Sequence, residues 1–292
     1  MTTAVARQTL SAYLALTKPR IIELLLVTTV PTMVVAHGGM PSLWLVVATL
    51  VGGALAAGGA NATNMYVDRD IDSVMERTKR RPLVTGAVTP RHALIFALAL
   101  EAVAAVWLWV VVNPLSAMLA LGATLFYVFV YTLWLKRTSR QNIVIGGAAG
   151  AVPVLVGWAA VTGTIEAAAL VLFAIIFLWT PPHFWALAIR YRADYEAADV
   201  PMLPVVASFD ATARQIIAYT VGLWAVSLVF HPLADMGPIY LIAAVVLGGV
   251  FTWHAVALAR SGTYERAMRL FKYSITYITL LFGAMAVDQL AR

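Results

Sequence analysis

The sequence predicts an all-α fold, a polytopic membrane protein with nine transmembrane helices. Of the 292 residues, 62% are hydrophobic and only 12% are charged, and the mean hydropathy is +0.85. A soluble domain carries about 45–50% apolar and about 25% charged residues, so this chain has more apolar surface than a soluble fold can hide. The apolar residues form continuous runs rather than the alternating pattern of a membrane barrel, and each run approaches the ~20 residues of a spanning helix.

The predicted spans make one domain over residues 1–292, with very short connections on one side of the membrane and two long ones, the second and the sixth, on the other. They cover residues 21–36, 43–63, 92–112, 115–135, 143–161, 167–189, 213–230, 239–259 and 273–290. Residues 1–17 are expected to be a flexible segment before the first span. Cys is absent, which excludes disulfides, thiolate metal sites and a thiol nucleophile.

The basic residues give this topology an orientation. Nineteen of the 20 Lys and Arg lie before the first span or in the even-numbered connections, and only Arg292 lies on the other side. The positive-inside rule then places the N-terminus in the cytoplasm and the C-terminus outside. The charge of +6 is explained by topology and by anionic lipid of the bilayer, so it indicates no nucleic-acid partner.

An acidic cluster continues the second span. At about 100° per residue, Asn64, Asp68 and Asp72 share one helix face, whereas Asp70 lies on another. Carboxylates four residues apart repel each other, and a hard cation offsets this repulsion. Mg²⁺ favours one or two carboxylates together with phosphate oxygens. The spacing therefore indicates a metal site for a phosphate-bearing ligand.

A basic run comes directly after these acids and comprises Arg77, Lys79, Arg80 and Arg81. Guanidinium groups opposite a carboxylate–metal pair are typical of a diphosphate site. The simpler alternative is a solvated loop of mixed charge that only sets the topology. The helical phase of the acids favours the metal–diphosphate interpretation.

Four segments resemble the intramembrane prenyltransferase superfamily of the UbiA type. The first is Asn64-x-x-x-Asp68-x-x-x-Asp72 with the basic run that ends in Arg81-Pro-Leu. The others cover residues 131–147, residues 179–186 with Pro-Pro-His-Phe-Trp, and residues 201–206 with Pro-Met-Leu-Pro. Within the superfamily, they are similar to the branch that farnesylates protohaem IX. The resemblance runs from about residue 17 to about residue 285.

The resemblance implies a UbiA-like fold, with the nine helices around a central cavity that opens to the cytoplasm. It implies that farnesyl diphosphate, protohaem IX (haem B) and water give haem O and diphosphate, with Mg²⁺ as cofactor, in a bacterial cytoplasmic (inner) membrane. Onward partners would be haem A synthase or terminal oxidase assembly. The implied metal ligands and catalytic residues are Asn64, Asp68, Asp72 and Asp194; the implied diphosphate ligands are Arg77, Arg81, Lys136 and Arg137.

A second acidic motif follows the sixth span but departs from the superfamily pattern of acids four apart. Asp194 and Asp199 are five apart, or about 140° around a helix. Either the helix has unwound before Pro201, or only Asp194 contributes to the metal site. Residues before proline are biased away from helix, which favours unwinding.

His183 is the candidate residue for binding haem. It follows Pro181 and Pro182 inside the sixth span, where two missing helix hydrogen bonds predict a kink. An ionisable group inside a span is a functional candidate, and a neutral imidazole can ligate iron. The alternative is a hydrogen-bonded core histidine. Glu101, in the third span, has no specific predicted role.

Three other functions remain open at this point. A sibling prenyltransferase would act on an aromatic ring or chlorophyllide, although the Pro-Pro-His-Phe-Trp and Pro-Met-Leu-Pro segments argue against it. A transporter would use intramembrane acids for ions, yet these acids cluster at one edge of the membrane. A non-enzymatic haem-binding or transport protein would not need the first acidic motif.

Overall fold

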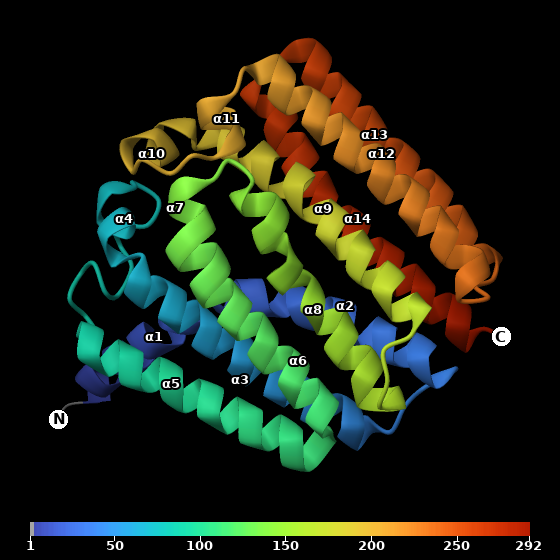
Figure 1. Cartoon of the computed structure of the whole chain (residues 1–292), viewed down its shortest axis with the longest axis horizontal. Helices are drawn as coiled ribbons and strands as arrows, with labels where there is room; N and C mark the ends of the chain where they lie inside the picture. The colour runs from blue at the N-terminus through green and yellow to red at the C-terminus, as the bar shows by residue number, and fades with distance from the viewer. Residues whose placement is uncertain (1–2) are drawn as a thin grey trace.

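The structure, a computed structural model, describes residues 3–292, with the side chains of residues 3–6, 20–21 and 23–26 outside this description. All the regular elements in that range are helices (Figure 1). The long helices are α2 (Pro19–His37), α3 (Leu43–Val67), α5 (Pro90–Trp107), α6 (Pro114–Leu125), α8 (Asn142–Thr162), α9 (Ala167–Arg190), α12 (Phe209–Leu233), α13 (Pro238–Ser261) and α14 (Tyr264–Leu290). The π-helical stretches η1 (Leu108–Val112) and η2 (Phe126–Leu135) extend α5 and α6.

These helices agree with the predicted spans. Eight segments of the described chain are long and apolar enough to cross a membrane. The 19-residue α2 supplies the ninth, and its described apolar part is Val27–His37. Large apolar side chains such as Trp109, Val110 and Trp253 are exposed on the outside, as expected for helices that face lipid. The chain is therefore an integral membrane protein.

The helix boundaries follow local chemistry. Proline stands in the first turn of α2, α5, α6 and α13, where its missing N–H removes no helix hydrogen bond. Oxygens of Ser42, Thr89, Asn113, Ser208 and Thr263 accept the backbone N–H three residues on, which caps the helices that follow. The kink predicted at Pro181 and Pro182 is not a break, because α9 continues past both prolines to Arg190.

The first segment contains a helix that the sequence analysis did not predict. Residues 3–17, which we expected to be flexible, form helix α1 (Thr3–Thr17) and pack on α3. Leu16 is fully buried, and the ring of Tyr13 meets that of Phe96 edge-on at 5.1 Å. Apolar contacts with α3 and α5 hold the second half of this helix, while the expected flexibility of residues 1–17 stays a prediction and residues 1–2 lie outside the described structure.

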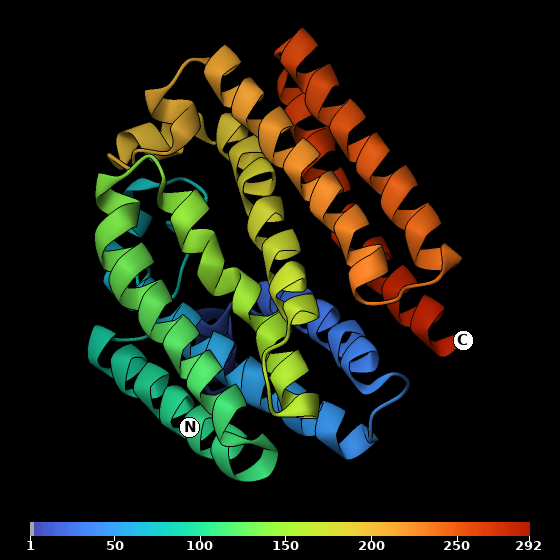
Figure 2. The same ribbon diagram turned by 45° about the vertical axis from the view of Figure 1, so that its right-hand side comes forward.

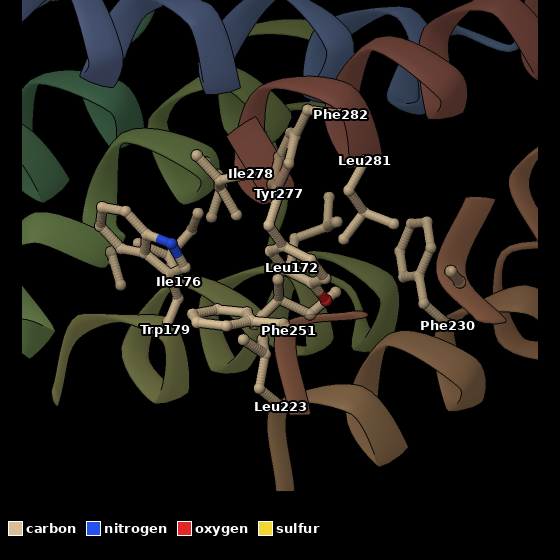
Figure 3. Packing of buried hydrophobic residues seen from close by; sticks show 14 of the residues in the cluster. Leu172, Ile176, Trp179, Leu223, Phe230, Phe251, Tyr277, Ile278, Leu281 and Phe282 are labelled. Atoms are coloured by element: carbon tan, nitrogen blue, oxygen red, sulfur yellow. The ribbon is translucent and has the colours of Figure 1, made fainter. Parts of the chain in front are cut away.

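The helices form two groups, visible in both ribbon views (Figures 1 and 2). Helices α2, α8, α9 and α14 make a closed cycle of contacts, and α12 and α13 pack outside α9 and α14. Helices α3, α5 and α6 form the other group, joined to the first through α2 and α8. The largest core lies in the first group, where Trp179, Leu223, Phe251 and Tyr277 converge from four helices (Figure 3).

Four short helices lie at one end of the bundle: α4 (Arg69–Val74), α7 (Lys136–Thr138), α10 (Arg192–Ala197) and α11 (Leu203–Val206) (Figure 1). A small apolar cluster joins the segments there. It contains Ile71 and Met75 after α3, Ile143 of α8, Ala188 of α9, and Tyr195, Val200 and Met202 of the second polar loop. This packing brings both predicted acidic loops to the same end of the molecule.

Two glycines of α8, close to this end of the bundle, are predicted to respond in opposite ways when alanine replaces them. A Cβ at Gly146 would overlap the ring of Tyr131 in η2, so Gly146→Ala should lower stability by about 1–3 kcal/mol. Gly150 has open space around its Cα, so Gly150→Ala should raise stability by up to about 1 kcal/mol. Thermal unfolding of the purified variants in detergent measures both, and equal shifts would contradict this packing.

Candidate active site

The acids after α3 lie where this helix leaves the bundle. Asp68 donates its backbone N–H to the Asn64 carbonyl at 2.9 Å, and Asp72 donates to the Asp68 carbonyl at 2.8 Å. The helical phase therefore continues from α3 into α4, as the spacing predicts. The side chains of Asn64, Asp68 and Asp72 are 4%, 0% and 2% exposed, whereas that of Asp70 is 61% exposed. Asp70 thus lies on a different face.

Each of these carboxylates has a basic partner. Lys136 of α7 donates to Asp68 Oδ2, and Arg81 donates to Asp72 Oδ2 at 2.6 Å. Arg137 binds both oxygens of the exposed Asp70 at 2.7 and 2.8 Å and lies 3.6 Å from Asp68 Oδ1. The fold therefore brings three of the four predicted diphosphate ligands into contact with the first acidic motif.

The fourth predicted ligand, Arg77, is placed differently. Its guanidinium donates to the Tyr195 hydroxyl at 3.1 Å, and its backbone N–H donates to Asp194 Oδ2 at 3.3 Å. Arg77 and Asp194 thus connect the two acidic loops. Asp199 is exposed in a left-handed conformation (φ 51°) after the end of α10, so the helix has ended before it.

The predicted metal ligands are not gathered around one point. Among the described residues, no three Asp, Glu or His side chains form a group that could hold a metal ion. Asp68 nevertheless offers a ligand atom, because its Oδ1 is buried and has no hydrogen-bond partner. A buried carboxylate oxygen that accepts no hydrogen bond is a suitable ligand for a hard cation such as Mg²⁺.

Asn64 links the acids to two residues that the sequence analysis did not assign to the site. Its Nδ2 donates to Asp68 Oδ2 at 2.8 Å and to Thr132 Oγ1 of η2 at 3.1 Å. Its Oδ1 accepts from Lys18 Nζ at 2.7 Å. Lys18 and Tyr195 stand outside the motif residues, and Thr132 lies in the segment 131–147 without a predicted role of its own. These contacts join segments far apart in the chain, so no local pattern could reveal them.

Electrostatic surroundings shift three groups of this region that lie outside the spans. Burial, together with the charges of Arg81 and Lys136, lowers the pKa of Lys18 from 10.5 to about 7. The hydrogen bonds from Arg137 hold the pKa of Asp70 well below its usual range. Burial raises the pKa of the Tyr195 phenol, which therefore stays protonated at neutral pH.

His183 lies outside this cluster, in the contact between α9 and α14. Its Nδ1 is 2.7 Å from Ser274 Oγ, and that hydroxyl donates to the Phe271 carbonyl at 2.6 Å. The Ser274 oxygen therefore accepts from Nδ1–H, which leaves Nε2 as the unprotonated nitrogen. The imidazole stacks on Trp179 at 4.3 Å and on Phe271 at 4.6 Å. The ring is thus fixed in one tautomer and one orientation.

These features define a class: an integral membrane protein, helical throughout its described residues, in which buried acids pair with partly buried bases at one end of the bundle. Residues 25–281 match the UbiA prenyltransferase family, which is most of the chain. The chain belongs to the UbiA prenyltransferase family of membrane enzymes.

Curated relatives align over almost the whole chain. A protein of Frankia alni named protoheme IX farnesyltransferase is 57% identical over 279 residues, 94% of this chain and 96% of the relative. A protein of the same name from Streptomyces avermitilis is 52% identical over 287 residues, 96% of this chain and 94% of the relative.

Solved structures show the same fold at low identity. A digeranylgeranylglyceryl phosphate synthase has a TM-score of 0.81 at 17% identity and covers 97% of this chain and 99% of its own. A UbiA homologue from Archaeoglobus fulgidus bound to GPP and Mg²⁺ has a TM-score of 0.66 at 17% identity, covering 94% and 99%. A divalent metal is thus bound within the family.

Proposed function

We propose that this protein transfers the farnesyl group of farnesyl diphosphate to a vinyl group of protohaem IX. Water adds in the same reaction, and the products are haem O and diphosphate. The observation that carries the proposal is the 57% identity to a protoheme IX farnesyltransferase over nearly the full length of both chains. The site supports it, because its partly buried basic side chains suit a diphosphate.

The basic side chains bind and orient the diphosphate in this proposal. Arg81 and Lys136 already lie against the acids, Arg137 is beside them, and Arg77 connects the second loop. The predicted ligands for Mg²⁺ are Asn64, Asp68, Asp72 and Asp194, of which Asp68 fits best because its Oδ1 accepts no hydrogen bond. When bound, the cation supplies positive charge that stabilises the leaving diphosphate.

The protein has little covalent chemistry of its own to perform. The allylic C–O bond breaks, its electron pair leaves with the diphosphate, and positive charge develops on the farnesyl group. The electron-rich vinyl group forms the new C–C bond. Water captures the resulting cation next to the porphyrin and gives up a proton, which balances the charge of the released diphosphate. Fixed basic side chains stabilise the departing anion, while the apolar helices exclude other water from the farnesyl cation.

The orientation in the membrane is part of the proposal. The acidic and basic loops share one end of the bundle, and 19 of the 20 basic residues fall on the corresponding side of the predicted topology. We infer that this end faces the cytoplasm of a bacterial cell, with the C-terminus outside. Haem O would then pass to haem A synthase or to terminal oxidase assembly.

The direct test is farnesyl transfer by membranes that contain the protein. Labelled farnesyl diphosphate, Mg²⁺ and haem should yield labelled haem O, and chelation of Mg²⁺ should abolish it. Aromatic acceptors and chlorophyllide serve as alternative acceptors in parallel reactions. Labelling of one of these instead would identify a sibling prenyltransferase, and haem binding without transfer would leave a haem-binding or transport protein.

Neighbouring acids give a sharper prediction. Asp68→Asn keeps the size of the buried side chain but removes its charge, so kcat/KM should fall roughly a hundredfold or more. Excess Mg²⁺ should recover part of this loss. Asp70→Asn removes the charge of an exposed carboxylate on another helix face, so it should lower kcat/KM much less. Equal loss in both variants, or none in Asp68→Asn, would refute the metal–diphosphate interpretation.

His183 is predicted to serve haem rather than farnesyl diphosphate, because it lies away from the acids and presents a free Nε2. His183→Ala should raise the KM for haem by about tenfold or more while farnesyl diphosphate still binds. His254→Ala is the matched control, since His254 is also a histidine inside a span with an aromatic neighbour, the tilted ring of Tyr273 at 4.9 Å. Normal haem turnover by His183→Ala would make it a packing residue.

A further inference from the structure

Lys18 is a partly buried basic residue beside the first acidic motif. Its ammonium makes one hydrogen bond, to the neutral Oδ1 of Asn64 at 2.7 Å. No carboxylate among the described side chains lies within ion-pair distance of it, whereas Arg81 and Lys136 each bind a carboxylate. An ammonium has three donors, so two of them remain for another partner. A cation that lacks a counter-ion in a protein interior is unfavourable unless a ligand compensates it.

The backbone of Lys18 is held in a conformation that is unfavourable for a residue with a side chain. Lys18 adopts a left-handed conformation (φ 53°, ψ 61°) directly before Pro19, a conformation that side-chain-bearing residues seldom adopt. Helix α3 keeps the turn in place, because Asn61 Nδ2 donates to the Thr17 carbonyl at 3.0 Å. Gly58 allows this approach, since a Cβ there would lie 3.3 Å from Thr17. Strain retained at one residue is typical of a functional position.

The surrounding charges favour an anion at this point. Lys18 experiences repulsion from Arg81 and Lys136 and attraction from Asp68 and Asp72, so it lies amid the same acid–base cluster. When Lys18 is protonated, three basic groups face two carboxylates, which leaves an excess of positive charge. A ligand that reaches all three bases needs several acceptor oxygens and a negative charge, which a diphosphate provides.

We propose that Lys18 is a further diphosphate-binding residue, delivered by the turn between α1 and α2. The inference rests on the proposed function and extends it. Lys18 also determines what Asn64 does. While the ammonium binds Oδ1, the amide directs Nδ2 to Asp68, so Asn64 connects the first turn of the chain to the metal-binding acid.

The test is equilibrium binding of labelled farnesyl diphosphate, with Mg²⁺ and without haem, to the purified full-length protein. Lys18→Met keeps the length of the chain and removes its charge, and should weaken binding by about tenfold or more. Lys18→Arg restores the charge and should bind close to the native protein. Lys272→Met, at an exposed lysine of α14, is the matched control and should bind normally.

The readouts separate a binding role from a structural one. In turnover, Lys18→Met should raise the KM for farnesyl diphosphate and leave the KM for haem unchanged, with no loss of thermal stability. Native-like binding by Lys18→Met overturns the proposal for Lys18 alone. Parallel loss of binding and thermal stability in Lys18→Met and Lys18→Arg also overturns it, since that marks a structural residue. Failure of the native protein to bind farnesyl diphosphate overturns the proposed function itself.

Discussion

Asp68 carries a carboxylate with no exposed surface at the end of an apolar helix, and the geometry of the site depends on compensating it. A buried charge without partners costs several kcal/mol. Lys136 and Asn64 both bind Oδ2, which fixes α7 against the end of α3. Because Asn64 must turn its Nδ2 towards Asp68, its Oδ1 faces the opposite way and meets Lys18. The buried charge of Asp68 thereby positions three segments that are distant in sequence: the turn at Lys18, the end of α3 and helix α7.

The bundle makes this arrangement of charges possible because it fixes where each spanning helix ends and each polar loop begins. In lipid, backbone polar groups must be satisfied within helices, so irregular chain is confined to the ends of the spans. The acidic loops therefore lie at one end, where Ile71, Met75 and Tyr195 pack in a common apolar cluster. Helix η2, π-helical up to α7, leads to Lys136 and places Thr132 next to Asn64. Such π-helical segments often occur at functional sites.

Sequence reasoning was accurate where a signal repeats locally. Hydropathy located the spans because each run is continuous. The 100° phase separated Asp70 from Asp68 because the helical phase of α3 carries over into α4. The last span begins at Tyr264, nine residues before its predicted start, because its first turns carry Glu265, Arg266 and Arg269 and are not apolar. The helix over residues 3–17 was missed because its contacts are with α3, beyond any local pattern.

The same distinction explains the site. Type and spacing indicated which residues carry charge, but the partner of each charge is set by contacts across the fold. Lys18 reaches Asn64 over 46 positions, Arg77 reaches Asp194 over 117, and His183 reaches Ser274 over 91. An amide oxygen that already accepts from an ammonium is a poorer ligand for a cation than a carboxylate oxygen that accepts no hydrogen bond and has only the guanidinium of Arg137 at 3.6 Å. The contacts therefore favour Asp68 over Asn64 as a metal ligand, although both stand in the same sequence motif.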